Sequence, residues 1–222
     1  KTGKRIHVLH ISTAEEMELL RDAKDLASVE VLPNHLTLAA PECYERLKGF
    51  AQQNPPVREQ RHQDALWRAL NAGIVDVLAT DHAPHTREEK ERPYPASPSG
   101  MPGVQTMVPV MLTHVNNGKL TLQRFVELTS AGPQRVFGLA DKGRIAEGYH
   151  ADFTVVDLKR KETITEEWSK SKCGWTPYDG FEATGWPVAT IIRGGFVMRD
   201  GEIVKKGGGQ PVRFNETLEP MG

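Results

Sequence analysis

The sequence predicts an α/β fold in which parallel βα units are followed by a small β unit. Short apolar runs at residues 6–11, 29–32 and 74–79 alternate with stretches of helical spacing, among them residues 59–72. From Gly143 onward the apolar residues recur at the spacing of short strands separated by turns. Three parallel strands are too few to close a barrel, so the chain alone predicts only part of one.

The chain of 222 residues, with 38% hydrophobic and 26% charged residues, can bury a core in one large domain or two small ones. Its net charge of -1 attracts neither nucleic acid nor an anionic membrane, and we expect neither as a partner. No apolar run approaches the roughly 20 residues of a membrane helix, and Cys43 and Cys173 match no metal or redox spacing. We expect a cytoplasmic protein with two reduced thiols. Because the sequence begins with Lys1 and not with an initiator Met, we expect the chain to begin in mid-domain.

The first helix is predicted to begin at about Ala14. Ser12 and Thr13 are N-cap candidates, and Glu15 and Glu16 each stand three residues after one of them, which is the spacing of a capping box. The side chains expected on the buried face of this helix are Met17, Leu20 and Ala23.

The middle of the chain is predicted to hold a loop and three helices. Residues 92–103 are rich in Pro, Ser and Gly, which predicts an ordered loop or lid. Apolar residues at helical spacing predict a helix over residues 104–115, and Thr121 is expected to cap the next one. Pro133 suits the first turn of a last short helix that Gly138 ends.

The β unit is predicted to contain five short strands and to lie beside the α/β part. These strands are expected at residues 144–146, 152–158, 188–192, 195–198 and 203–204. Asp200 and Gly201, between the last two strands, form a dipeptide typical of a two-residue hairpin turn.

The most informative stretch is residues 79–85, Ala-Thr-Asp-His-Ala-Pro-His, directly after the third apolar run. It places Asp81, His82 and His85 at the end of a strand, where the active sites of barrel enzymes collect. Carboxylates and imidazoles bind divalent cations, and a carboxylate beside a metal-bound water can carry a proton. The same residue types are also common in a capped turn that binds nothing.

His7 and His10 lie in the first apolar run, and strand geometry separates them. Side chains alternate between the faces of a strand, so residues three apart point in opposite directions. His10 lies nearer the carboxyl end, on the same rim as Asp81, and is the better metal-ligand candidate. We interpret His7 as a hydrogen-bonded structural histidine on the helix-facing side. His35 has no comparable geometric argument, and we leave it out of the site.

Four motifs occur in one order and spacing: Leu-His-Ile-Ser-Thr at residues 9–13, Asn-Pro-Pro-Val-Arg at 54–58, Thr-Asp-His-Ala-Pro-His at 80–85 and Pro-Ser-Gly-Met-Pro-Gly at 98–103. Together they resemble the dihydroorotases of the metal-dependent amidohydrolase superfamily. The resemblance continues through the segments at residues 148–153 and 211–218, so it covers nearly the whole chain.

This resemblance implies a (β/α)8 TIM-like barrel joined to a small β-sandwich, with one or two zinc ions at the carboxyl rim of the barrel. Residues 1–142 then correspond to about strands six to eight and carry the site residues, and residues 143–222 correspond to the sandwich and the C-terminal tail. His10 corresponds to the metal ligand on the sixth strand and Asp81 to the ligand on the eighth.

The family's chemistry is implied for the same positions. Asp81 corresponds to the base that moves a proton from the zinc-activated water to the leaving amide nitrogen. Asn54 and His85 correspond to contacts with the pyrimidine ring and its carboxylate, and Ser99 and Gly100 to a backbone contact on a mobile loop. The implied reaction is the reversible conversion of N-carbamoyl-L-aspartate to dihydroorotate in de novo pyrimidine biosynthesis.

The sequence departs from the family's pattern on its N-terminal side. The His-x-His pair of the first strand, the carboxylated Lys or Asp of the fourth, the His of the fifth and the Arg for the substrate carboxylate have no counterpart before His10. His10 and Asp81 alone cannot complete a four-coordinate zinc site. We therefore interpret the chain as the C-terminal half of such an enzyme, inactive alone. Its candidate partners are a small-molecule substrate, the missing N-terminal half and further copies in a homo-oligomer.

Two alternatives stay open. One is a related cyclic amidase, such as a dihydropyrimidinase or an allantoinase, which a substrate without the carboxylate would distinguish. The other is a metal-free, non-catalytic homologue that acts as a scaffold, which a metal assay on the full-length protein would distinguish.

Overall fold

The computed structural model describes residues 2–215 of the 222-residue chain. Lys1 and the last part of the motif at residues 211–218 lie outside the described residues, as does the end of the predicted C-terminal tail. Within the described residues, no helix is both long and apolar enough to span a membrane.

Three parallel strands form the first sheet, in the order β1-β2-β3: β1 (Ile6–Val8), β2 (Ala27–Val31) and β3 (Val77–Leu78). This arrangement confirms the predicted parallel βα order, although β1 and β3 are shorter than the apolar runs that contain them. The ladder continues past the strand ends, because Ile11 N donates to Glu30 O at 2.9 Å and Ala79 N donates to Val31 O at 3.1 Å. All three strands therefore end at one edge of the sheet.

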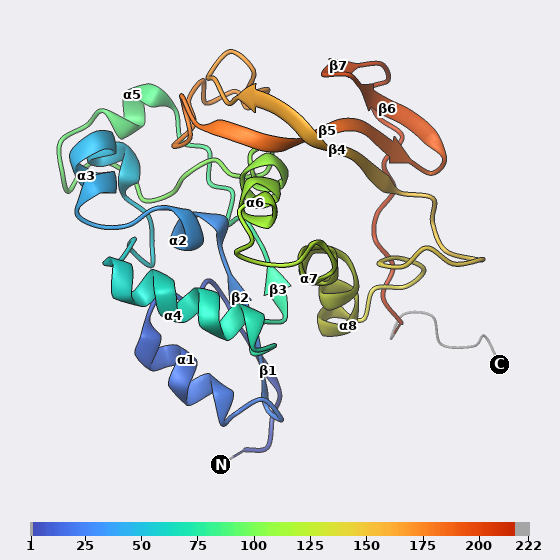
Figure 1. Cartoon of the computed structure of the whole chain (residues 1–222), viewed down its shortest axis with the longest axis horizontal. Helices are drawn as coiled ribbons and strands as arrows, with labels where there is room; N and C mark the ends of the chain where they lie inside the picture. The colour runs from blue at the N-terminus through green and yellow to red at the C-terminus, as the bar shows by residue number, and fades with distance from the viewer. Residues whose placement is uncertain (1, 216–222) are drawn as a thin grey trace.

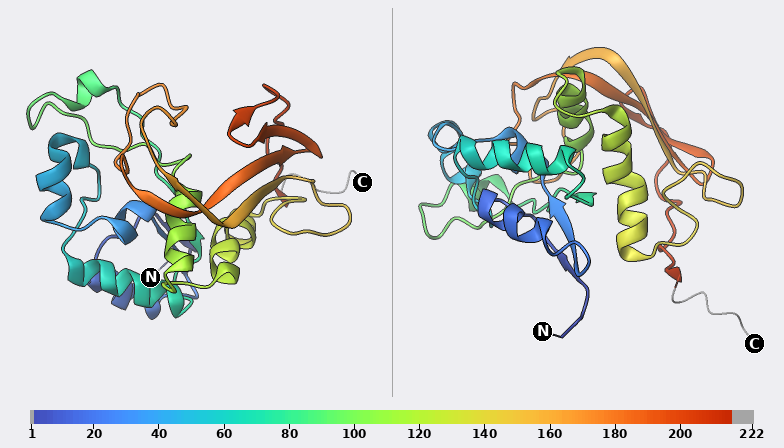
Figure 2. Two further views of the ribbon diagram at one scale, coloured as in Figure 1. Left: turned by 45° about the horizontal axis from the view of Figure 1, so that its top comes forward. Right: turned by 60° about the horizontal axis from the view of Figure 1, so that its bottom comes forward.

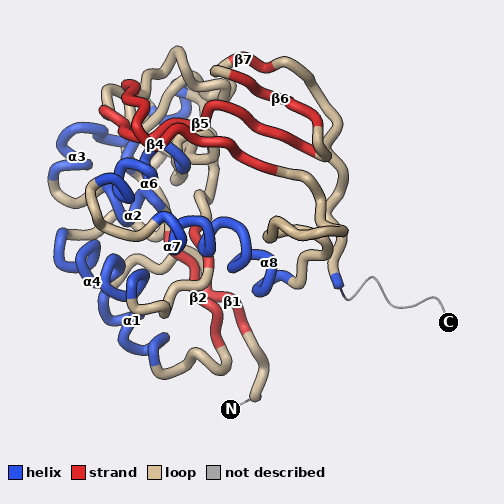
Figure 3. Tube along the Cα trace, turned by 45° about the vertical axis from the view of Figure 1, so that its right-hand side comes forward, coloured by secondary structure: helices blue, strands red, loops and turns tan. Residues whose placement is uncertain are grey.

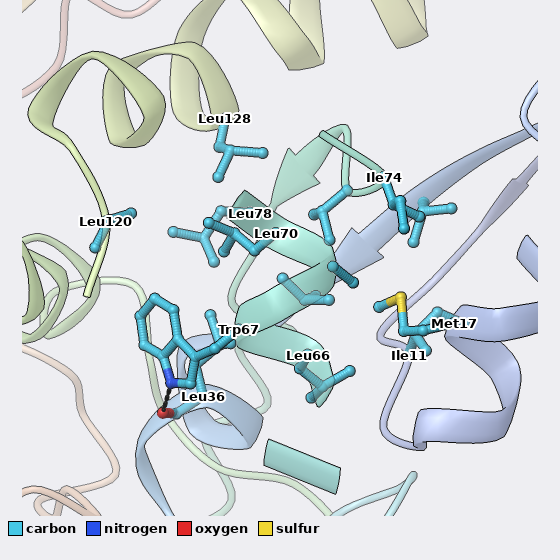
Figure 4. Packing of buried hydrophobic residues seen from close by; sticks show 14 of the residues in the cluster. Ile11, Met17, Leu36, Leu66, Trp67, Leu70, Ile74, Leu78, Leu120 and Leu128 are labelled. Atoms are coloured by element: carbon cyan, nitrogen blue, oxygen red, sulfur yellow. Dashed lines mark hydrogen bonds between the residues drawn. The ribbon is translucent and has the colours of Figure 1, made fainter. Parts of the chain in front are cut away.

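Helices α1 and α4 pack against each other beside this sheet (Figure 1). Thr13, the second of the two N-cap candidates, forms the predicted capping box with Glu16, since each side chain bonds to the other residue's backbone N–H. Trp67 of α4 is buried, and its indole N–H donates to the carbonyl oxygen of Leu36 at 2.9 Å (Figure 4). The loop after β3, here called the Asp81 loop, leads into α5. The helices of the first 90 residues are α1 (Ala14–Arg21), α2 (Pro33–Thr37), α3 (Glu42–Leu47), the 3-10 turn η1 (Lys48–Ala51), α4 (Gln60–Asn71) and α5 (Arg87–Lys90).

Three further helices lie between the two sheets (Figures 1 and 3). They are α6 (Met107–Asn116), α7 (Leu122–Val126) with the π turn η2 (Glu127–Ala131), and α8 (Gly132–Phe137). Thr121 caps α7 as predicted, because its hydroxyl accepts from Arg124 N. Pro133 lies in the first turn of α8 and Gly138 ends that helix, which confirms both predictions. Residues 92–103 form a loop with no helix of their own.

The C-terminal part forms an antiparallel sheet in the order β4-β5-β6-β7: β4 (Phe153–Thr163), β5 (Glu182–Ile192), β6 (Gly195–Arg199) and β7 (Glu202–Ile203). Asp200 and Gly201, with φ of 49° and 88°, make the predicted two-residue turn between β6 and β7. The strand predicted at residues 144–146 is wrong. All three of its residues are exposed, Ile145 to 88%, and no strand of the described residues pairs with this segment or covers its apolar side chain.

Two hydrophobic clusters stabilise the arrangement that Figure 2 shows from two further sides, and Figure 4 shows residues of the first cluster. The first lies among β1–β3, α1, α4, α6 and α7 and includes Leu36, Leu66, Leu70, Leu78 and Leu128. The second combines residues of the α/β part with residues of the C-terminal part. Its members include Leu38, Val57, Met101, Ile164, Trp175 and Trp186.

Candidate metal and substrate site

His10 and Asp81 lie just past the ends of β1 and β3, at the edge of the sheet where all three strands end, here called the rim. His10 N donates to Glu30 Oε1 at 3.4 Å, which holds this backbone against the end of the central strand. His10 and Asp81 have φ of 37° and 46°, a left-handed conformation that costs about 1–3 kcal/mol per non-glycine residue. Backbone strain of this kind concentrates at functional sites.

The imidazole of His10 is the clearest candidate for a metal ligand. Its Nδ1 is buried and has no hydrogen-bond partner among the described residues. His7, by contrast, lies 2.8 Å from Ser28 Oγ through Nδ1 and 3.2 Å from Glu30 Oε2 through Nε2, which confirms the interpretation of a hydrogen-bonded histidine. Buried polar atoms are almost always paired, and a zinc ion is one partner that binds an imidazole nitrogen.

The donor chemistry of His10 and Asp81 fits part of a zinc site. Within residues 2–215, no three His, Cys, Asp or Glu side chains converge as a metal-binding group. Cys43 and Cys173 are buried free thiols in the second hydrophobic cluster and do not add to this site. The ligand set that the described residues supply is therefore incomplete.

His35, for which the sequence offers no geometric argument, is buried in α2. Its Nε2 lies 3.0 Å from the carbonyl oxygen of Pro55, and its Nδ1 is buried without a partner in the described part of the chain. Burial lowers the pKa of His35 to about 4; the nearby His10 and Arg58 also lower it, and Asp81 raises it. His35 therefore lies near His10 and Asp81, in α2, the short helix that follows β2, whose end lies at the same edge of the sheet.

His82 has a different role from the one its motif suggests. Its Nδ1 accepts from Gly103 N at 3.0 Å and from Val104 N at 3.4 Å, and burial lowers its pKa, which favours the neutral ring that can accept. His82 therefore anchors the Pro/Ser/Gly-rich loop.

His85, Ser99 and Gly100 come together in the structure. His85 Nε2 donates to Ser99 O at 3.0 Å. Gly100 has φ of +135°, and a Cβ there would lie 2.5 Å from Ala83 Cβ, so only glycine fits. Its N–H donates to Gln52 O at 2.9 Å. The loop at residues 98–103 thus lies against both the Asp81 loop and the segment that holds Asn54.

Asn54 is exposed, between two residues that are held in place. Gln53 is buried, accepts from Asn34 Nδ2 at 2.9 Å and lies 2.7 Å from His35 Nε2. Pro55 O, on the other side, is the contact of His35 described above. No hydrogen bond among the described residues joins His10 or Asp81 to Asn54, His85 or Ser99, so hydrogen bonds do not link the candidate ligands to the candidate substrate contacts.

A rim of parallel strands that carries histidine and aspartate at the strand ends is a feature of barrel hydrolases that depend on metal. The model of the amidohydrolase family matches residues 3–204. The chain belongs to the amidohydrolase family.

The chain spans about half the length of the relatives and structures named below. It is 42% identical over 214 residues to a dihydroorotase of Pyrococcus furiosus, covering 96% of this chain and 50% of that protein. It is 39% identical over 207 residues to a dihydroorotase of Bacillus licheniformis, covering 91% and 48%. An L-hydantoinase (dihydropyrimidinase) structure from Arthrobacter aurescens superposes with a TM-score of 0.86 and 32% identity, covering 91% and 47%. A D-hydantoinase (dihydropyrimidinase) from Thermus sp. gives a TM-score of 0.87 and 30% identity, covering 94% and 48%.

Proposed function

We propose that this chain is the C-terminal part of a zinc-dependent dihydroorotase, which interconverts N-carbamoyl-L-aspartate and dihydroorotate in pyrimidine biosynthesis. The observation that carries the proposal is the unsatisfied Nδ1 of His10 on a strained backbone, on the same rim as the equally strained Asp81. The relatives named dihydroorotase support this choice among amidohydrolases. In this proposal, residues 1–142 supply about strands six to eight of a (β/α)8 barrel, and residues 143–222 supply a small β-sandwich domain.

Each candidate residue has a proposed task. Bound zinc supplies a Lewis acid and an activated water. His10 would hold the metal through its imidazole, whose buried Nδ1 has no hydrogen-bond partner among the described residues. Asp81 is both a ligand and the catalytic base, which accepts a proton and returns it to the amide nitrogen that leaves. One carboxylate can do both tasks because it has two oxygens.

Asn54, His85, Ser99 and Gly100 are the proposed substrate contacts. The N–H of Gly100 already donates to Gln52 O, so a backbone contact from Gly100 would use its carbonyl oxygen. The Nε2–H of His85 already donates to Ser99 O. For this nitrogen to reach substrate, that bond must open, so we expect the His85 ring to turn away from Ser99 O when substrate binds.

Two other functions remain candidates. A related cyclic amidase, such as a dihydropyrimidinase or an allantoinase, is supported by the hydantoinase structures with TM-scores of 0.86 and 0.87. A metal-free scaffold is supported by the incomplete ligand set of the described residues. The proposed partners are a small-molecule substrate, the N-terminal half that supplies the other ligands, and further copies in a homo-oligomer. We propose a cytoplasmic location, with no nucleic acid or membrane as a partner.

The test supplies the missing half. The chain is co-expressed with the N-terminal half of the Pyrococcus furiosus dihydroorotase, and the complex is assayed in both directions, with dihydrouracil, hydantoin and allantoin as competing substrates. The proposal requires zinc-dependent turnover of dihydroorotate, little turnover of the other three, and loss of activity in the Asp81→Asn control. Preference for a ring without the carboxylate would favour the related amidases. A fully assembled complex that binds no zinc would favour the scaffold.

A further inference from the structure

Lys90, the last residue of α5, is a buried cation to which the proposed reaction assigns no role. Its side chain is 1% exposed. The Nζ donates to Gln52 O at 3.0 Å and to Pro98 O at 2.8 Å, and lies 5.8 Å from the centre of the Trp175 ring. No ion pair among residues 2–215 includes it. Two carbonyl dipoles and one aromatic face are thus the groups that compensate this ammonium.

The two carbonyls belong to the two segments that carry the proposed substrate contacts. Gln52 lies two residues before Asn54, and Pro98 directly precedes Ser99. Gly100 N also donates to Gln52 O, at 2.9 Å, so that single carbonyl accepts from both Lys90 and the loop. The ammonium of Lys90 therefore lies where these two segments meet.

The backbone around Lys90 leaves little space for it to shift. Ser97 Oγ donates to Lys90 O at 3.2 Å, which ties the start of the loop to the end of α5. A Cβ at Gly49 would lie 3.0 Å from the same carbonyl oxygen. The Nζ is therefore held at a fixed place relative to both segments.

We propose that Lys90 is a positioning residue, whose ammonium sets the spacing between the Asn54 segment and the Ser99–Gly100 segment. This inference rests on the proposed function, because those segments are its substrate contacts. Burial lowers the pKa of Lys90 to about 8, so the ammonium is present at neutral pH. A methionine at this position has a side chain of similar length but no hydrogen-bond donor. The Lys90→Met variant therefore separates the effect of packing from that of the two hydrogen bonds.

The test uses Lys90→Met in the complete enzyme, with Lys172→Met as a control because Lys172 is exposed. We expect the KM for dihydroorotate to rise about tenfold in Lys90→Met, with kcat, zinc content and melting temperature changed little. We also expect its effect on KM to be non-additive with Asn54→Ala, since both act on one contact. A KM that stays within twofold of the wild type, or an additive effect, would overturn the inference.

A second readout does not depend on the reaction. In Lys90→Met, the amide hydrogen of Gly100 should exchange about tenfold faster, while amides in α4 keep their rates. The positioning role would be rejected if the exchange rate at Gly100 stayed unchanged, or if it rose equally at Gly100 and in α4. This holds even if the enzyme acts on a cyclic amide other than dihydroorotate. If the wild type turns over no cyclic amide, the proposed function fails and the exchange result alone decides whether Lys90 holds the loop.

Discussion

The indole N–H of Trp175 donates a 2.8 Å hydrogen bond to the carbonyl oxygen of His85, which lies 90 residues earlier in the chain. Trp175 is buried, and its ring packs edge-on against Phe50 at 4.9 Å. A residue of the C-terminal part therefore supports the loop that carries Asp81 and His85. The site is built on both parts of the chain.

This contact predicts a separation between two variants of Trp175. Trp175→Phe keeps most of the buried ring and loses the N–H, so the free energy of unfolding should fall by only about 1–2 kcal/mol. Trp175→Ala leaves a cavity and should lower it by about 3–5 kcal/mol. Urea denaturation of both variants measures the difference, and equal losses would show that the ring contributes nothing beyond its hydrogen bond.

Asp81 is predicted to be indispensable for turnover. In the complete enzyme, Asp81→Asn keeps the shape of the side chain and removes the basic carboxylate, so kcat should fall on the order of 10²-fold or more. Asp81→Ala should also lower the zinc content. Steady-state rates and metal analysis check both variants, and near-normal turnover by Asp81→Asn with metal bound would exclude Asp81 as the base.

Substitutions of His10 and His85 are predicted to cause different defects. His10→Ala removes the unsatisfied Nδ1 and should reduce bound zinc. His85→Ala breaks the contact with Ser99 O and should change KM or kcat with zinc retained. Metal analysis of the two purified variants decides the point, since an equal loss of zinc from both contradicts this division of roles.

His35 is predicted to make the protein sensitive to acid. Its pKa is about 4 when folded, below the usual 6.5, so between these values the unfolded state binds more protons. Stability should therefore fall as the pH drops through this window, and the contribution of His35 should be about 2 kcal/mol smaller at pH 5 than at pH 7. In His35→Gln, the free energy of unfolding should therefore differ by about 2 kcal/mol less between pH 5 and pH 7 than it does in the wild type. His114 is the matched comparison, because burial lowers its pKa to about 4 as well.

The chain expressed alone is predicted to self-associate. β1 pairs only with β2 within the described sheet, and Ile6 and Leu9 beside its open edge are 57% and 52% exposed. Exposed apolar side chains on an unpaired strand favour association between copies. Sedimentation and zinc analysis of residues 1–222 should find oligomers with little zinc; a monomer that binds zinc stoichiometrically would contradict this expectation.

Local signals predicted the fold well where neighbours in sequence decide the geometry. Thr13 and Thr121 cap their helices because the groups they bond lie three residues away, and Asp200-Gly201 turns the chain for a similar reason. The strand at residues 144–146 failed because a partner strand, which no local pattern encodes, is absent from the described residues around it.

Long-range contacts explain what the sequence did not predict at the site. His35 follows the central strand, but the groups that contact its ring belong to Pro55 and Gln53, about 20 residues away. Lys90 resembles any exposed lysine in the sequence, and only the fold brings the carbonyls of Gln52 and Pro98 to it.

The second hydrophobic cluster has a mechanical consequence. It joins Leu38 and Met101 to Trp175 and Trp186. Residues from before and after position 142 therefore share one hydrophobic cluster. A rigid-body rotation of one part against the other would expose two tryptophans to water, at a cost of several kcal/mol (about 25 cal/mol per Å² of apolar surface). A hinge between the two parts would therefore have to break the second hydrophobic cluster.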